Sequence, residues 1–316
     1  RNILSADAIQ KTKKGVIIVN CARGGLVDEA AVRAGLDSGH ISAAAFDVFI
    51  EEPAKDNVLF GAPNFVATPH LGAATSEAQE NVALQVADQI SDYLLTGAVT
   101  NALNTPSISA EEAPRLKPYA DLAEKLGLFA GQISDGGFTD IEIGFEGEPA
   151  HLNTKPLTAA AVAGALRPIM SDVNMVSAPE VLKANGVTLT EATRSDSPIY
   201  DNLIRIRVKV AGAWRDVAGA IVAGVPRIVE VKGMALDAKF RSHILYVNNV
   251  DQPGFIGALG VMLGEANVNI ATFNLGREGE GDEAVALVGV DTDISDDVLQ
   301  KINGLPHVRY AKVLDF

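Results

Sequence analysis

The stretch Val16-Ile17-Ile18-Val19-Asn20-Cys21-Ala22-Arg23-Gly24-Gly25 decides the fold of the first part of this chain. Its four leading apolar residues are typical of a strand buried on both faces of a parallel sheet, and a polar turn follows them directly. Residues 28–36 then predict a helix capped by Asp28, and residues 43–48 predict a second strand. A strand, a helix and another strand predict a right-handed crossover within one parallel sheet.

Two more segments complete this part of the chain. Residues 65–67 predict a third strand, and residues 75–95 carry apolar side chains at helical spacing, which predicts a long helix that closes the unit. The sequence starts with Arg1 rather than Met, so we expect it to begin inside a domain. We therefore assign residues 1–74 to the C-terminal part of a Rossmann-like parallel-sheet domain, and residues 75–107 to the long helix and a return segment.

A change of composition marks a second domain. Residues 105–114 are rich in Ser, Pro and Glu, as in a linker. Beyond them, helical and strand-like patterns alternate, which predicts a mixed α/β domain at residues 108–240. The helices are expected at residues 114–133 and 158–170, and the strands at 140–145, 187–192, 203–210, 214–221 and 227–231.

The last segment, residues 241–316, has the clearest pattern. It predicts a strand, a helix opened by Pro253, two strands around a Gly-rich turn, a capped helix and a final strand. This order, βαββαβ, is the split ferredoxin-like motif. The whole chain is therefore expected to be of α/β class, with three successive domains.

Composition excludes several classes of function. Apolar residues make up 47% of the chain and charged residues 21%, as in folded proteins. The net charge of −14 opposes binding to a nucleic-acid backbone, and no apolar run approaches the roughly 20 residues that span a bilayer. Cys21 is the single cysteine, which excludes an internal disulfide and favours the cytoplasm. We interpret it as a small buried apolar residue rather than a nucleophile.

Three turns at strand ends contain residues that suit the oxidation of a 2-hydroxy acid. Arg23 could hold a carboxylate through two parallel hydrogen bonds. His70 titrates near neutral pH and could exchange the hydroxyl proton, and Glu52 could orient its imidazole. Taken singly, each side chain also fits a solvated loop residue. Their combination at the ends of successive strands, where open α/β sheets bind ligands, favours a catalytic site.

The sequence of these turns resembles the D-isomer-specific 2-hydroxyacid dehydrogenase family. The resemblance rests on Asn20-Cys21-Ala22-Arg23-Gly24, on Asp47-Val48-Phe49 with Glu52-Pro53, and on Pro69-His70. It implies that Arg23 binds substrate carboxylate, that Glu52 pairs with His70, and that His70 is the acid/base. It also implies NAD as the cofactor, lined by Cys21, Ala22, Arg23, Asp47, His70, Gly72 and Ala73.

Within that family, the order of segments is similar to the long branch that oxidises 3-phosphoglycerate to 3-phosphohydroxypyruvate with NAD in serine synthesis. The resemblance implies an intervening domain that binds an allosteric anion or substrate, a final ACT domain that binds serine, and a homo-oligomer of two or four chains. No G-x-G-x-x-G motif follows a strand anywhere in the sequence. We therefore expect these residues alone to be inactive.

Two regulatory sites are predicted. Asp251 opens a helix and could hold the ammonium group of serine. Asn269 matches an asparagine that contacts the ligand in related ACT domains, and Asn249 stands where those relatives often carry an aromatic residue or histidine. A helix cap is the simpler interpretation of Asp251. The cations Lys232, Lys239 and Arg241 could form an anion site, although a solvated charged surface would explain them too. No metal site is predicted.

Two other functions remain open from the sequence. A dehydrogenase for another 2-hydroxy acid, such as a glyoxylate or hydroxypyruvate reductase, would have the same three turns. Such enzymes usually end soon after the long helix, so the additional domains count against this alternative. A non-catalytic amino-acid sensor is the second alternative, and the presence of Arg23, Glu52 and His70 counts against it.

Overall fold

The computed structural model describes residues 2–134, 137–279 and 281–316 of the chain. These residues form two compact units, Arg1–Ser91 and Asp92–Phe316, which we describe separately. None of the described helices is long and apolar enough to cross a membrane.

The first unit contains a small parallel sheet, as the sequence predicts. Strands β1 (Val16–Asn20), β2 (Ile41–Phe46) and β3 (Phe65–Ala67) pair in that order, and helices α1 (Ala6–Gln10) and α2 (Glu29–Asp37) complete the unit. Asp28 caps α2 by accepting a hydrogen bond from the Ala31 N–H. The core combines side chains of both helices with one side of the sheet. Its buried members include Ile9, Ile18, Val32, Leu36, Phe46 and Leu59.

The prediction that the first strand is buried on both faces is wrong for this unit. Ile18 is buried, whereas Ile17 and Val19 on the opposite face of β1 are 65% and 64% exposed. Helices α1 and α2 pack on one face of the sheet only, because successive side chains of a strand point to opposite faces and a single crossover covers one of them.

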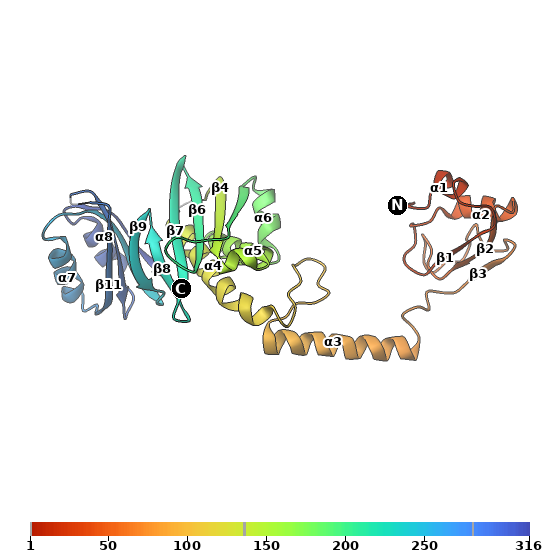
Figure 1. Cartoon of the computed structure of the whole chain (residues 1–316), viewed down its shortest axis with the longest axis horizontal. Coiled ribbons are helices and arrows are strands. Elements are labelled where there is room, and N and C mark those ends of the chain that lie inside the picture. The colour runs from red at the N-terminus through yellow and green to blue at the C-terminus, as the bar shows by residue number, and fades with distance from the viewer. Residues whose placement is uncertain (1, 135–136, 280) are drawn as a thin grey trace. The chain divides into compact units, whose positions relative to one another are not determined.

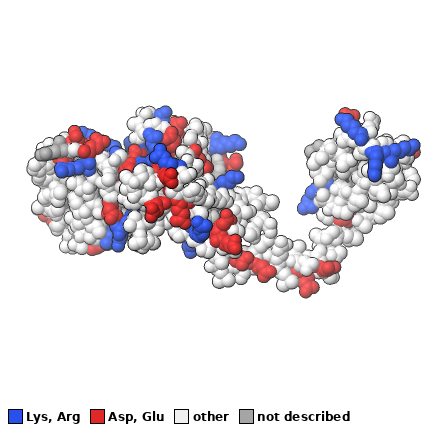
Figure 2. Space-filling view, in the orientation of Figure 1, with Lys and Arg blue, Asp and Glu red and all other residues white. Residues whose placement is uncertain are grey.

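The long helix forms but does not close the first unit. Helix α3 (Ser76–Thr96) contains no buried residue. Its apolar side chains at the predicted helical spacing are largely exposed, and they are Val82, Leu84, Val86, Ile90, Leu94 and Leu95. The helix carries acidic but no basic residues, so it appears red against white in Figure 2.

The middle of the chain forms a six-stranded sheet with helices against it (Figure 1). Strands β4 and β5 are parallel, and the remaining neighbours are antiparallel, in the order β5-β4-β6-β7-β8-β9. The helices are α4 (Ala113–Gln132), η1 (Glu148–His151), α5 (Thr154–Leu166) and α6 (Ala178–Ala184). The strands are β4 (Asp140–Gly147), β5 (Thr188–Arg194), β6 (Asn202–Val210), β7 (Ala213–Val222), β8 (Val225–Val231) and β9 (Met234–Lys239). Helix α6, the short helix η1 and strand β9 were not predicted.

Glycines bring helices α4 and α5 into close contact. A Cβ atom at Gly127 would lie 2.0 Å from the Ala161 carbonyl oxygen, and one at Gly131 would lie 2.2 Å from that of Ala165. Only a residue without a side chain fits at these positions. The two helices therefore pack almost backbone to backbone, and together they cover one face of the sheet.

The last segment confirms the βαββαβ prediction. Its sheet has the order β11-β12-β10-β13, and all neighbours are antiparallel. The elements are β10 (His243–Val250), α7 (Phe255–Glu265), β11 (Ile270–Arg277), β12 (Glu283–Val290), α8 (Asp296–Asn303) and β13 (Val308–Asp315). Leu245 and Val247 pack with both helices, whereas Ile244 and Tyr246 belong to the core of the preceding domain. The core of the middle domain therefore extends into the last domain, which also has a separate core beneath its own two helices.

Candidate active site

Glu52 and His70 meet at the carboxyl edge of the first sheet. The His70 Nδ1 atom lies 2.7 Å from Glu52 Oε2. A carboxylate can only accept hydrogen bonds, so Nδ1 carries the proton and Nε2 is left as the atom that can exchange a proton with a substrate. Two hydrogen bonds lower the pKa of Glu52 below its ordinary value, and the bond from His70 has a larger effect than the bond from the Phe49 N–H. Glu52 is therefore ionised at neutral pH.

Asp47 organises the turn that presents His70. Its carboxylate accepts hydrogen bonds from Thr68 Oγ1 at 2.5 Å and from the backbone N–H groups of Leu71 and Gly72 at 2.7 and 2.9 Å. These bonds lower the pKa of Asp47, and the bond from Thr68 has the largest effect. His70 has a φ of +56°, which is uncommon for a residue with a side chain. Asp47 therefore holds the imidazole in an otherwise unfavourable backbone conformation.

A cavity of about 460 Å³ opens beside the dyad. It is lined by Glu52, His70 and Asp47 together with the apolar side chains of Phe49, Phe60 and Ala67. Its size is within the range of small-molecule sites, and apolar walls with a few polar groups are typical of them. The dyad is partly accessible, since the His70 side chain is 45% exposed and that of Glu52 is 34% exposed.

Arg23 does not meet the other two predicted catalytic residues in this structure. It is exposed, and its Nη1 donates to the Ala22 carbonyl oxygen at 2.7 Å. The loop nevertheless packs against the Glu52 turn, because a Cβ at Gly24 would lie only 1.8 Å from the Phe49 carbonyl oxygen. The backbone of Arg23 is thus anchored next to the site, while its guanidinium uses a local acceptor.

Cys21 is exposed in the same turn, which corrects the prediction that it is buried. It follows the strand end rather than the packed face of β1, so no core is available to it. Ala22, Gly72 and Ala73 are exposed as well. Their small side chains leave the backbone at this edge accessible, which suits the approach of a flat ring.

Glu29 is a supporting residue that the sequence did not reveal. It is buried at the start of α2, and its Oε1 accepts a hydrogen bond from the Ile50 N–H at 2.9 Å. Its Oε2 accepts another from Asn57 Nδ2 at 2.7 Å. Glu29 therefore fixes the turn from which Glu52 projects. Its sole sequence signal is an acid in the first turn of a helix, which many surface helices share.

The three residues predicted to bind serine do not converge within one chain. Asp251 lines a cavity of about 300 Å³ and pairs with Arg277 Nη1 at 2.7 Å. Asn249 is buried at 1% exposure, and Asn269 donates to Asp291 Oδ2 at 2.6 Å. Asn269 and Arg277 stand at opposite ends of β11, roughly 25 Å apart at the rise of a strand. Of the three, only Asp251 lines this cavity.

Lys232 lies apart from the other two cations predicted for an anion site, which corrects that prediction. Lys232 lies in the β8–β9 turn and pairs with Glu283, whereas Lys239 ends β9 opposite Arg227. The two lysines are seven positions apart in the hairpin, which is roughly 20 Å of strand. Arg241 lines a different cavity from Lys232. These side chains cannot hold one phosphate together.

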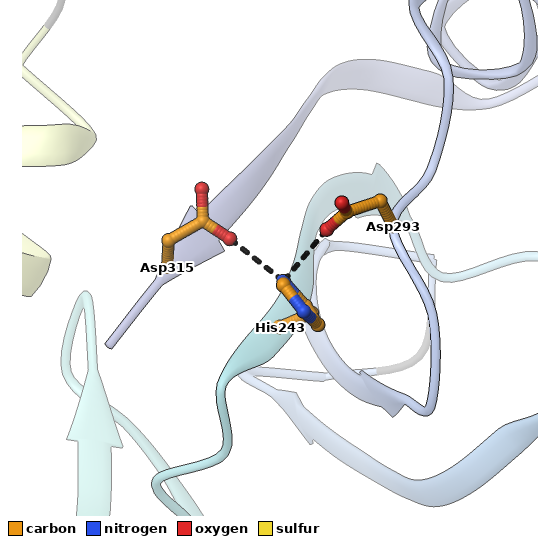
Figure 3. Close-up of side chains that lie close together, drawn as sticks. All are labelled: His243, Asp293 and Asp315. Atoms are coloured by element: carbon orange, nitrogen blue, oxygen red, sulfur yellow. Dashed lines mark hydrogen bonds and ion pairs between the residues drawn. The ribbon is translucent and has the colours of Figure 1, made fainter.

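A histidine and two aspartates meet where the last domain begins and ends (Figure 3). The His243 Nδ1 atom lies 2.9 Å from Asp315 Oδ1 and 3.0 Å from Asp293 Oδ1. Such a set of ligand atoms could hold a metal ion, but both carboxylates are largely exposed, at 69% and 84%. The contact with Asp315 joins the start of β10 to the end of β13, and the contact with Asp293 joins β10 to the loop between β12 and α8. This structural role accounts for the arrangement.

Three family models match the chain in succession. Residues 1–72 match the D-isomer specific 2-hydroxyacid dehydrogenase, NAD binding domain. Residues 115–232 match the D-3-phosphoglycerate dehydrogenase intervening domain, and residues 243–307 match the ACT domain.

Curated relatives align over the whole chain. The D-3-phosphoglycerate dehydrogenase of Bacillus subtilis is 37% identical over 317 residues, which are 100% of this chain and 60% of the relative. That of Methanocaldococcus jannaschii is 37% identical over 316 residues, again 100% of this chain and 60% of the relative. The chain thus spans 60% of the length of these relatives.

Proposed function

Since this chain belongs to the D-3-phosphoglycerate dehydrogenase family, we propose that the whole protein oxidises 3-phosphoglycerate to 3-phosphohydroxypyruvate with NAD. The observation that carries the proposal is the hydrogen bond of 2.7 Å between Glu52 and His70 beside a cavity of substrate size. The chain spans 60% of the length of these curated relatives, so the activity is proposed for the whole protein.

In this mechanism the protein positions the substrate and moves one proton. His70 Nε2 accepts the proton of the substrate hydroxyl while the hydride leaves the carbon that bears this hydroxyl. In the reverse reaction His70 returns the proton. Bound NAD supplies the hydride acceptor. Glu52 keeps the proton on Nδ1 and stabilises the charge that His70 gains. Arg23 exchanges the Ala22 carbonyl for the substrate carboxylate, with which it can form two charge-assisted hydrogen bonds.

Substrate preference tests the proposal against a general 2-hydroxyacid dehydrogenase. The whole protein should reduce 3-phosphohydroxypyruvate with NADH more efficiently than glyoxylate. We expect the ratio of kcat/KM values to be on the order of 10² or more, because a site built for a polar group rejects an analogue without it. Initial rates from NADH absorbance measure this ratio. Equal kcat/KM values would contradict phosphoglycerate as the substrate class.

We further propose that serine binds at Asp251 in the ACT domain, where the carboxylate would hold the ammonium group. At about a hundredfold excess over its dissociation constant, serine should raise the melting temperature of this domain pair by roughly 5–10 °C. The Asp251→Ala variant should lose this shift. The control Asp297→Ala removes an acid on the exposed start of α8 and should keep it. Equal shifts in both variants would refute Asp251 as the ligand.

Assembly and location follow the same family resemblance. We propose that the protein is a homo-oligomer of two or four chains in the cytoplasm, with no nucleic acid or membrane partner. Asn269 and Asp251 lie far apart within one chain, so a serine site that uses both would need residues of two chains. Sedimentation equilibrium of the whole protein measures the oligomeric state.

A further inference from the structure

A second cavity lies between the two downstream domains. Its volume is about 350 Å³, within the range of small-molecule sites. We call it the interdomain pocket. The middle domain contributes Ile133, Ala213, Trp214, Arg215 and Lys232, and the ACT domain contributes Tyr246, Asn248 and Tyr310. These residues belong to strands β7, β10 and β13, the end of α4 and the β8–β9 turn.

Asn248 offers this pocket an acceptor without a partner. Its Nδ2 donates to Glu283 Oε1 at 2.7 Å, and this contact fixes the orientation of the amide because a carboxylate can only accept. The Oδ1 atom is buried and has no hydrogen-bond partner among the described residues. Leaving a buried acceptor unpaired is costly. A ligand with an O–H or N–H group would satisfy it.

The charge of the pocket favours an anion. Lys232 and Arg215 both line it. The acid next to it, Glu283, already accepts from Lys232 and Asn248 and lies 3.6 Å from Arg309. Burial alone would raise the pKa of Glu283, but these bonds outweigh it and leave the pKa below its ordinary value. Arg215 and Lys232 are thus the charged residues that line the pocket, and no carboxylate is among its described lining residues.

Three aromatic rings form the walls. Tyr246 and Tyr310 meet edge to face with ring centroids 6.2 Å apart. Trp214 is held by the cations of β6, because Arg207 lies 4.7 Å and Lys209 lies 5.7 Å from the centre of its ring. Flat, fixed walls of this kind favour a ligand that is itself an aromatic ring.

We propose that the interdomain pocket binds an aromatic acid with a hydroxyl or amino group next to its carboxylate. The carboxylate pairs with Arg215 and Lys232, the donor group satisfies Asn248 Oδ1, and the ring stacks between Trp214 and the tyrosines. Because the pocket is built from both domains, its occupancy stabilises their mutual packing. This site is separate from the Asp251 cavity, so the protein has a second effector site of different chemistry.

The experiment uses the sole tryptophan of the chain, Trp214, as the reporter. Titration of the 316-residue chain with 3-phenyllactate should change its tryptophan fluorescence saturably. 3-Phenylpropionate, which lacks the hydroxyl, should bind at least about tenfold more weakly, because Asn248 Oδ1 then stays unpaired. No saturable change up to millimolar 3-phenyllactate would overturn the proposal, and equal affinities of the two acids would overturn the role of Asn248.

Variants locate the ligand. Arg215→Gln and, as an independent variant, Lys232→Gln should each weaken 3-phenyllactate binding about tenfold. The control Lys301→Gln removes a cation from the last turn of α8 and should bind normally. Asp251→Ala should also bind normally, and a loss of binding there would place the ligand in the other cavity and overturn the proposal. Normal binding by both pocket variants would overturn it as well. Thermal melts of each variant establish that it is folded.

Discussion

The His70→Asn variant of the whole protein is expected to oxidise 3-phosphoglycerate with a kcat roughly 10²–10⁴ lower than the unmodified protein. Asparagine can keep a hydrogen bond to Glu52 but cannot accept and return a proton near neutral pH. The loss should therefore appear in kcat more than in KM, since substrate contacts with Arg23 are unchanged. Steady-state rates of NADH formation provide the measurement.

A matched histidine variant separates catalysis from general damage. His151 lies exposed in η1, outside the unit that contains the dyad, so His151→Asn should leave kcat unchanged. The Glu52→Gln variant keeps a hydrogen-bond acceptor but no negative charge. Its kcat should therefore lie between those of the His70→Asn and His151→Asn variants. Full activity of the His70→Asn variant would remove the proposed mechanism.

The same Gly-to-Ala change should have opposite effects in two helices. At Gly127 the new methyl group would lie 2.0 Å from the Ala161 carbonyl oxygen, which forces helices α4 and α5 apart. We expect a loss of about 1–3 kcal/mol in the free energy of unfolding. At Gly257 in α7 a Cβ meets nothing within 4 Å, so alanine should stabilise the helix by up to about 1 kcal/mol.

Urea unfolding followed by Trp214 fluorescence measures both changes, because Trp214 lies beside the core that the two downstream domains share. The Gly257→Ala variant controls for the general effect of alanine on helix propensity. A Gly127→Ala variant as stable as the unmodified chain would show that the two helices can separate without cost. That result would contradict the close packing described for α4 and α5.

Local sequence patterns predicted most of the fold. Asp28 and the residues after it specify a capped helix, and the alternation in the last segment specifies βαββαβ, because caps and periodicity act over a few residues. The elements that were missed, α6, η1 and β9, are short and give too few repeats to be recognised. Burial was harder to predict. Ile17 and Val19 look like core residues, but burial depends on which elements cover the sheet.

The sequence by itself determined the order of elements and the chemical types at the strand ends, including Glu52 and His70, whose turns leave neighbouring parallel strands. Only the tertiary structure decided which distant side chains meet. It joined Glu29 to the Glu52 turn and built a pocket from Trp214 and Asn248, whereas it separated Asp251 from Asn269 and Lys232 from Lys239. The reason is geometric. Each strand residue adds about 3.3 Å to the length of a strand, and the register between strands determines which side chains come into contact.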